Sequence, residues 1–459
     1  MKKSLKRFLA GIVAATSLFT FAACGGDPAS SGSGDGTFGG NDGKTVVRYF
    51  TFNTANFNQE LNEAIKNDFN KKYPDIKVQT QIATSSFYTT LLTDFSGNTE
   101  ADVFCMEPGD IYPFLSANYL EPLDDYFAAS EKVKLDDIWD INKEAYAFDY
   151  NTKKFGAGKT YAVLKDWTTD SMLLYNRKLF TPEQLEMIEG DDDGDGVADP
   201  LTFEEFELLC AELVKKSGRT ITQYSFLPGL AEAKVLAQFI TNAGECWFGD
   251  DYNSNFDTPA VQDVVKMYYG VLGINEANNT GSTFYPLFAQ GKCAMIMGGL
   301  YCIDSYDLDN MDLGIAYPPV KEKGMESKPY TTGCVGFAMS SRSKVKDAAF
   351  KFIEWYLGYF GEKQAYECNN FPAIQKYTTE IMLNPEKNTN ASRLKSAQKF
   401  YESLSKAVII DRNIYCSQAS FENVELKFAG NYIEGEINLA EFCDNLDYEI
   451  NKRVRQAKG

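Results

Sequence analysis

Three short strand-like stretches decide the fold of this chain: TVVRYF at residues 45–50, IKVQTQI at 76–82, in which apolar and polar residues alternate, and DVFCM at 102–106. Each has the length and the β-branched or aromatic content of a strand. The two segments between them, 57–69 and 87–95, have the apolar periodicity of amphipathic helices. This alternation of strand and helix predicts a parallel sheet covered by helices, which is an α/β fold.

Polar and aromatic side chains follow the first and third predicted strands. Ligands of open α/β sheets bind beyond the carboxyl ends of the strands. The candidates are therefore Phe52, Asn53 and Asn56 after the first strand, and Glu107 and Asp110 after the third. Amides and carboxylates are suited to hydrogen bonding with ligand hydroxyls. Helix capping by the amides and a solvated turn around the carboxylates are the alternatives.

The N-terminus has the pattern of a bacterial lipoprotein leader. A basic start is followed by an apolar stretch at residues 8–21, which is too short to span a membrane. It ends in Phe-Ala-Ala-Cys, which resembles a lipobox, and this predicts lipid modification of Cys24. We expect a signal peptide at 1–23 and a flexible Gly- and Ser-rich tether at 24–44. The alternative is an ordinary secretory signal peptide.

Composition argues against two classes of function. The 459 residues are enough for two domains and include no histidine, which excludes Ser-His and Cys-His catalysis and His-ligated metals. We therefore expect a protein that is not an enzyme. The formal net charge of −19 opposes binding to nucleic acid, because phosphate backbones repel an acidic surface.

Nine cysteines follow Cys24, and none of them forms a CxxC pair or has zinc-site spacing. Most lie in apolar runs, which predicts buried thiols that pack as small hydrophobic side chains. A single disulfide, for example between Cys293 and Cys302, remains open at this point.

Eight segments, in order along the chain, resemble the family 1 extracellular solute-binding proteins, which include maltose-binding protein. They are KYPDIKVQ (72–79), ADVFCMEPGD (101–110), LEPLDDYF (120–127), TYAVLKDWTTDSMLLYNRKLF (160–180), DPLTFEEF (199–206), FAQGKCAMIMGGLY (288–301), VGFAMSSRSKVKDAAFKFIEWYL (335–357) and NNFPAI (369–374). The resemblance covers the chain from about residue 45 to the C-terminus.

The resemblance implies a two-lobed, type II periplasmic-binding-protein-like fold. Each lobe would hold a mostly parallel sheet flanked by helices, and the lobes would close on a ligand like a hinged clamp. Lobe one would comprise 45–165 plus 331–385, and lobe two 166–330 plus 386–459. The chain would cross between lobes where these ranges meet.

The resemblance also implies further ligand contacts. Asp166 and Trp167 lie at the first expected crossing, where a tryptophan is suited to stacking on a sugar beside a hydrogen-bonding carboxylate. Tyr301 occupies the place of an aromatic stacking residue in the family. Gly333, near the second crossing, and Glu422 are weaker candidates. Core packing is the alternative for the aromatic residues.

Together these features predict a receptor that captures a carbohydrate, in particular an oligosaccharide, in a cleft between the lobes. It would deliver the sugar to the permease subunits of an ABC importer. We expect a monomer, anchored by lipid to the outer face of the bacterial cell membrane. The alternatives are a receptor of the same fold for a polyamine, peptide or metal chelate, and a lipid-anchored hydrolase.

An acidic segment at residues 191–202 fits the calcium-loop pattern D-x-D-x-D-G with Asp at position nine. Position twelve is Thr202 instead of the usual Glu, and Glu204 or Glu205 is a possible substitute. Thr202 and Glu205 also read as a capping box that opens the next helix. We expect a structural Ca²⁺, and an acidic loop without an ion is the alternative. The expected ligands are Asp191, Asp193, Asp195, the Val197 carbonyl, Asp199 and Glu205.

Overall fold

The computed structural model describes residues 43–52, 55–83, 86–192, 194, 196–230, 232–276, 284–306, 311–331, 335–367, 370–388 and 390–459. Several predicted features lie outside this part of the chain. These are the leader and anchor with Cys24, Asn53, the side chain of Asn56, Asp193, Asp195 and Gly333.

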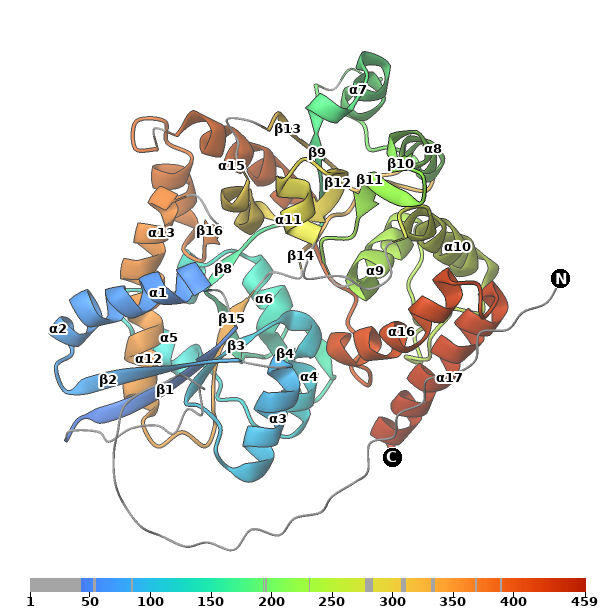
Figure 1. Ribbon diagram of the computed structural model, residues 1–459. Coiled ribbons are helices and arrows are strands. Elements are labelled where there is room, and N and C mark those ends of the chain that lie inside the picture. The colour runs from blue at the N-terminus through green and yellow to red at the C-terminus, as the bar shows by residue number, and fades with distance from the viewer. Residues whose placement is uncertain are drawn as a thin grey trace, which may run out of the picture. The chain divides into compact units, whose positions relative to one another are not determined.

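The first sheet contains the three strands that the sequence predicts. Its described strands run in the order β2-β1-β3-β15-β7, and β1 pairs in parallel with both β2 and β3. The strands β15 and β7 extend the sheet in antiparallel pairing, so the sheet is mixed. Figure 1 shows β1, β2 and β3 beside β15, which comes from a distant part of the chain. The bounds are β1 Thr45–Thr51, β2 Ile76–Ile82, β3 Val103–Met106, β7 Ala162–Leu164 and β15 Gly336–Met339.

Helices around this sheet begin and end near the predicted positions. The segment after β1 continues from α1 (Ala55–Ala64) through a π-helical turn (Ile65–Phe69) into α2 (Asn70–Lys72), just before Tyr73-Pro74. A residue that precedes proline disfavours helical backbone, which accounts for this end. The helix α12 packs against β1 and β15, and α6 packs against β7. The other bounds are α3 Phe87–Gly97, α4 Tyr112–Ser116, α5 Asp124–Ala129, α6 Ile141–Tyr146, α12 Lys346–Trp355, α13 Gly361–Glu367 and α14 Gln375–Tyr377.

The second sheet has the order β10-β11-β12-β9-β13 among the described residues. Only β11 and β12 pair in parallel, whereas the sequence led us to expect a mostly parallel sheet. Local apolar pattern does not reveal strand direction, so this difference was not visible in the sequence. The bounds are β9 Met172–Asn176, β10 Lys215–Ser217, β11 Thr220–Leu227, β12 Cys293–Gly298 and β13 Leu313–Ala316.

Helices also flank the second sheet. The helix α8 packs against β11, and α11 packs against β12. The C-terminal helices α16 and α17 pack against each other and against α10, and α16 also packs against α9. The bounds are α7 Pro182–Glu189, α8 Phe203–Leu213, α9 Glu232–Asn242, α10 Pro259–Ile274, α11 Phe284–Ala289, α15 Ala391–Ser403, α16 Gln418–Ile433 and α17 Leu439–Lys458.

Very short strands lie on the chain segments that connect the two sheets. After β7 the chain passes through β8 (Asp166–Trp167) to β9, and after β13 it returns through β14 (Tyr330–Thr331) to β15. The strand β8 pairs with β16 (Phe371–Pro372), and β14 pairs with β17 (Val408–Ile409). These links lie where the first two crossings are expected, and the lobe boundaries stay a prediction. A small sheet β5-β4-β6 (Lys154–Phe155, Ala147–Asp149, Lys159–Thr160) completes the described strands.

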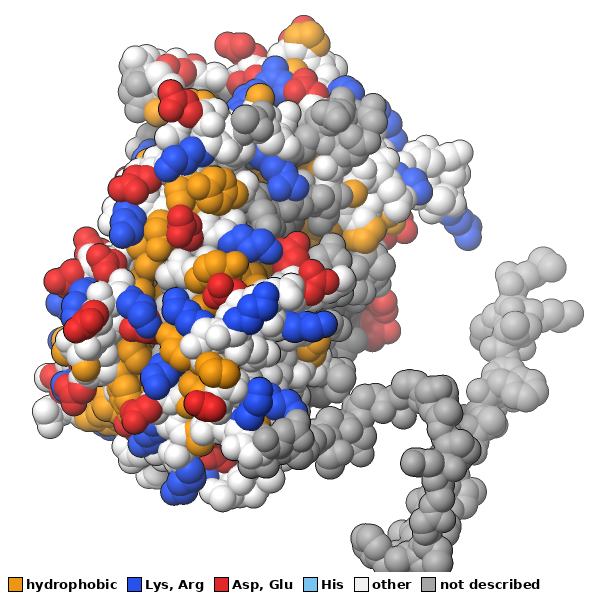
Figure 2. Space-filling model, turned by 90° about the vertical axis from the view of Figure 1, so that its left-hand side faces the viewer, with side chains coloured by type: hydrophobic (Ala, Val, Ile, Leu, Met, Phe, Trp, Pro, Cys, Tyr) orange, Lys and Arg blue, Asp and Glu red, His pale blue; other side chains and the backbone are white. Residues whose placement is uncertain are grey.

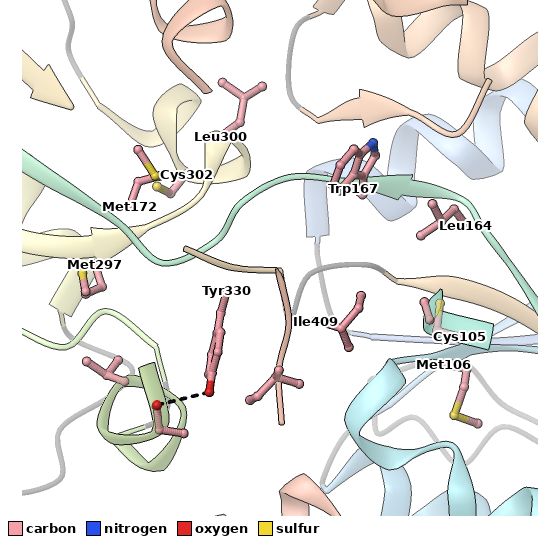
Figure 3. Close-up of a cluster of buried hydrophobic side chains, with 14 of the residues drawn as sticks. Cys105, Met106, Leu164, Trp167, Met172, Met297, Leu300, Cys302, Tyr330 and Ile409 are labelled. Carbon is pink, nitrogen blue, oxygen red and sulfur yellow. Dashed lines mark hydrogen bonds between the residues drawn. The ribbon is translucent and has the colours of Figure 1, made fainter. Parts of the chain in front are cut away.

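Buried apolar side chains of both sheets and of the links form one core. Figure 3 shows part of it, including Cys105 of β3, Trp167 of β8, Tyr330 of β14 and Ile409 of β17. The hydroxyl of Tyr330 hydrogen bonds with the hydroxyl of Thr241 on α9, which ties a link to the second sheet's helices. The links are therefore packed elements of the core.

The seven described cysteines form no disulfide. The thiol of Cys293 donates to the carbonyl of Met295, and that of Cys302 donates to the carbonyl of Gly299. A disulfide between Cys293 and Cys302 is therefore absent. Burial raises the pKa of thiols such as Cys105, which keeps them protonated.

Charges of both signs are mixed on the face that Figure 2 shows, so the negative net charge forms no continuous acidic field there. Within the described residues, no helix has both the length and the apolar content needed to span a membrane.

Candidate ligand-binding site

A cavity of about 290 Å³ lies where strand ends of both sheets meet the link β8. Residues from the carboxyl ends of β1 and β3 line it, as the rule for open α/β sheets predicts. Residues that follow β11 and β12 also contribute. The described lining residues are Thr51, Phe52, Phe57, Glu107, Lys165, Asp166, Asp170, Leu230, Lys234, Tyr301, Val335, Gln364 and Asn370.

Four of the predicted contacts come together in this cavity although they are far apart in sequence. They are Phe52, Glu107, Asp166 and Tyr301. The aromatic members offer apolar ring surface, and the carboxylates offer acceptors, which is the mixed character of a site for a polyhydroxylated solute.

Asp166 is held in place by two polar neighbours. Its carboxylate forms an ion pair with Lys165, and it accepts a hydrogen bond of 3.0 Å from the side-chain amide of Asn370. The ammonium of Lys165 also lies over the ring of Phe57, 4.7 Å from its centroid. These contacts fix a charged pair and an amide at the cavity wall.

A second charged group is centred on Lys234 of α9. Its ammonium lies 3.4 Å from the carboxylate of Glu107 and 3.9 Å from that of Glu422 on α16. Burial by itself would lower the pKa of Lys234, but the negative charges of Glu107 and Glu422 outweigh it and raise the pKa. The lysine is therefore a buried, charged residue that links three elements.

Asp110 lies beside this group, and its side chain is almost fully buried. It accepts a hydrogen bond of 3.0 Å from the backbone N–H of Ala419, at the start of α16. Burial, reinforced by the charge of Glu107, raises the pKa of Asp110 from 3.8 to about 7. Burial likewise raises the pKa of Glu422. Both predicted residues thus lie close enough to Glu107 for its charge to act on them, and neither is among the residues that line the cavity.

Tyr301 supplies the most exposed aromatic surface of the cavity. Its side chain follows β12 and is 37% exposed, and its hydroxyl lies 3.0 Å from the hydroxyl of Tyr285. A hydrogen bond between two hydroxyls orients the ring while leaving its face open to a ligand.

Trp167 does not line this cavity. Adjacent side chains of a strand point to opposite faces, so on β8 Asp166 faces the cavity and Trp167 faces away from it. Trp167 is 3% exposed, packs edge-on against Trp139 at a centroid distance of 5.2 Å, and borders a separate hollow of about 710 Å³. The aromatic surface of the cavity comes instead from Phe52, Phe57 and Tyr301.

Several lining residues were not among the sequence candidates. Lys234 follows the carboxyl end of β11. The rule that ligands bind beyond strand ends, applied to the second sheet, would therefore have predicted that the segment around Lys234 contributes to the site. Lys165 and Asp170 flank the predicted pair Asp166-Trp167, and Asn370 lies in the NNFPAI segment. For these residues only the tertiary structure shows which side chains face the cavity.

The acidic loop is described in part. The carboxylate of Asp191 accepts hydrogen bonds of 2.8 Å from the backbone N–H groups of Gly194 and Gly196. Gly196 has φ +86°, the left-handed conformation that position six of a calcium loop requires. Glu205 is engaged in a capping box with Thr202 at the start of α8. The described residues show no cluster of three or more metal-ligating side chains.

The mixed two-sheet α/β architecture with a cavity at the strand ends is that of a periplasmic-binding-protein-like solute receptor. Residues 53–359 match a family model described as bacterial extracellular solute-binding protein. Because the match spans more than half of the chain, the protein belongs to this family. It is a binding protein and not an enzyme. No curated protein matches the chain by sequence.

Solved structures of solute-binding proteins share the fold. One is an ABC substrate-binding protein from Listeria monocytogenes in complex with cycloalternan, with 19% identity, a TM-score of 0.68, and coverage of 89% of this chain and 98% of that chain. A second, from Thermotoga lettingae, is bound with alpha-D-tagatose and has 19% identity, a TM-score of 0.68, and coverage of 90% and 100%. A third is the maltose/maltodextrin-binding domain MalE from Bdellovibrio bacteriovorus bound to maltotriose, with 16% identity, a TM-score of 0.67, and coverage of 90% and 100%.

Proposed function

We propose that this protein captures a carbohydrate in the cavity at the strand ends and delivers it to an ABC importer. The observation that carries the proposal is the convergence of aromatic rings and hydrogen-bonding groups on one cavity. Tyr301 and Phe52 supply ring surface, and Asp166 and Asn370 supply polar groups for hydroxyls. The sugars bound by the three solved relatives support the same class of ligand.

The cavity volume of 290 Å³ is near the lower end of the range of about 300–1,000 Å³ for small-molecule sites. A ligand longer than the cavity would extend beyond it, so an oligosaccharide would place only its recognised end among these residues. Closure of the protein around that end would supply the remaining contacts.

Extracytoplasmic capture also needs a place of attachment. We propose that Cys24 carries a lipid, that residues 24–44 form a tether, and that the binding body stays at the outer face of the cell membrane. The lipobox-like sequence and the Gly- and Ser-rich composition support this part of the proposal.

A thermal-shift screen against mono- and oligosaccharides tests the proposal. A ligand that binds the folded state stabilises it by mass action and so raises the unfolding midpoint. At a ligand concentration 100 times Kd, the free energy of unfolding rises by about 2.7 kcal/mol. We expect at least one sugar to raise the midpoint of the wild-type chain. We expect Tyr301→Ala and Asp166→Asn to reduce this shift.

Tyr448→Ala is the matched control, because Tyr448 on α17 is 62% exposed and does not line the cavity. It should leave the sugar-induced shift unchanged. If no sugar of a broad panel stabilises the protein, or if the three variants behave alike, the proposal fails.

A further inference from the structure

Lys234 has hydrogen-bonding capacity that the protein leaves unused. It lines the cavity, and its side chain is 15% exposed. Among the described residues its ammonium group makes one hydrogen bond, a long one of 3.4 Å to Glu107. Glu422, at 3.9 Å, is too far away to accept another. Because an ammonium group has three N–H donors, at least two of them are available to a ligand.

Glu107 likewise keeps unused capacity, in this case as an acceptor. One oxygen of its carboxylate accepts the bond from Lys234, and in the described part of the chain no other group donates to this carboxylate. A carboxylate has about four lone-pair sites. Glu107 can therefore accept a hydrogen bond from a ligand while it keeps its ion pair with Lys234.

The other ion pair of the cavity has less capacity left. Both carboxylate oxygens of Asp166 already accept bonds from the protein, one from Lys165 and one from Asn370. Lys234 and Glu107 differ from this pair in their origin as well. Lys234 comes from α9 beside the second sheet, whereas Glu107 follows β3 of the first sheet. A ligand that binds both of them is thus held by both halves of the fold.

The opposite charges of this pair limit the kind of group that can use both side chains. An anion would be attracted by Lys234 but repelled by Glu107, and a cation would meet the reverse. A hydroxyl group carries no charge and both donates and accepts. Two hydroxyls on neighbouring carbon atoms satisfy the pair, because one donates to Glu107 while the other accepts from Lys234.

We propose that Lys234 and Glu107 together recognise a vicinal diol of a pyranose, and that Lys234 distinguishes this sugar from its deoxy analogues. The inference rests on the proposed function for the carbohydrate and adds which part of the sugar is recognised. Burial by itself would lower the pKa of Lys234, but the charges of Glu107 and Glu422 raise it, so the donor stays an ammonium group. Its hydrogen bond to a hydroxyl is charge-assisted and therefore strong.

Isothermal titration calorimetry with D-glucose, D-galactose, D-mannose and D-xylose, each beside its monodeoxy analogues, tests the recognition of a diol. We expect at least one of the four parent sugars to bind. Removal of either hydroxyl of the diol should weaken binding about tenfold, the size of one hydrogen bond to a charged group. At least two adjacent ring positions should be sensitive in this way.

Substitution of the two side chains assigns each hydroxyl. Lys234→Met should weaken binding of the parent sugar about tenfold and remove most of the penalty for deleting one hydroxyl of the diol. Glu107→Gln should reduce the penalty at the adjacent position. A residue that only supports the fold would instead weaken parent and analogues by the same factor. Lys427→Met is the matched control and should change neither value, because Lys427 on α16 is 56% exposed and does not line the cavity.

Three results would overturn the inference. If every monodeoxy analogue binds as tightly as its parent, no diol is recognised, and the carbohydrate receptor stands. If Lys234→Met weakens parent and analogues equally, Lys234 acts only as a support for Glu107. If none of the four parent sugars binds, recognition of a single pyranose is wrong, and the oligosaccharides of the thermal-shift screen decide the proposed function.

A second variant covers the case in which Lys234→Met does not fold. Lys234→Met combined with Glu107→Gln removes both charges of the pair, so neither partner is left as an uncompensated buried charge. This double variant should bind the parent sugar and both sensitive analogues with similar affinity. Retention of either penalty would refute the assignment of the diol to these two residues.

Discussion

At the scale of single residues, Asp110 has the clearest physical signature. It is buried, and Glu107, Glu422, Lys234, Tyr88 and Cys416 are the other titratable groups around it. Its pKa is about 7 in the folded protein and 3.8 is its ordinary value, so between these values the folded state holds a proton that the unfolded state releases. Stability therefore falls as the pH rises through this window.

We expect Asp110→Asn to remove the pH dependence of stability that Asp110 causes. The amide keeps an acceptor for the Ala419 N–H but does not titrate. Urea unfolding at pH 4 to 8 measures it. The wild-type chain should lose stability relative to the variant as the pH rises, with most of the change between pH 4 and 7. A difference between the two proteins that stays constant with pH would contradict this.

Only some residues of the site could be predicted from the sequence. Glu107 was predicted because it follows a strand, and a strand end is visible in the pattern of apolar residues. Tyr301 was predicted from the resemblance to the family. The orientation of Asp166 and Trp167 was not predictable, because β8 is only two residues long and no alternating pattern indicates which side chain faces the cavity. Lys234 was missed because its partners Glu107 and Glu422 are distant in sequence.

At the scale of elements, the loop between α7 and α8 gives the next prediction. Its glycine conformation and the hydrogen bonds of Asp191 fit a calcium loop, so we propose that Ca²⁺ binds there and stiffens the connection. Saturating Ca²⁺ should raise the thermal midpoint over that in a chelator by about 2 °C or more. Differential scanning calorimetry measures the shift.

Asp191→Asn should abolish this calcium effect, whereas Glu207→Gln, which removes an exposed carboxylate further along α8, should retain it. An identical midpoint with Ca²⁺ and with chelator would refute the site. Glu205 is not expected to be a strong ligand, since its carboxylate already accepts bonds from the backbone N–H and the hydroxyl of Thr202.

Elements with a strong local pattern were predicted well. The strands β1, β2 and β3 and the helix α3 appear where periodicity places them, because one buried face fixes each pattern. The links β8 and β14 are two residues each, which is too short to show an alternation of apolar and polar residues. They exist because distant segments, β16 and β17, pair with them.

At the scale of the whole molecule, the prediction concerns attachment. If Cys24 carries the lipid, Cys24→Ser should release the protein from the membrane fraction into the medium or the soluble extracytoplasmic fraction. Immunoblotting of fractionated cells measures this. The sugar-induced thermal shift of the released protein should equal that of the wild type, since the tether precedes the binding body. Unchanged membrane association of the variant would exclude Cys24 as the anchor.

The two side chains of β8 have an optical consequence. The chain has four tryptophans, and two of them, Trp139 and Trp167, pack together on the side of the link opposite Asp166. A ligand that moves Asp166 also moves the backbone that carries Trp167. The two tryptophans do not contact the ligand, but their intrinsic fluorescence can thus report occupancy of the cavity. Affinities can therefore be measured on the unlabelled protein.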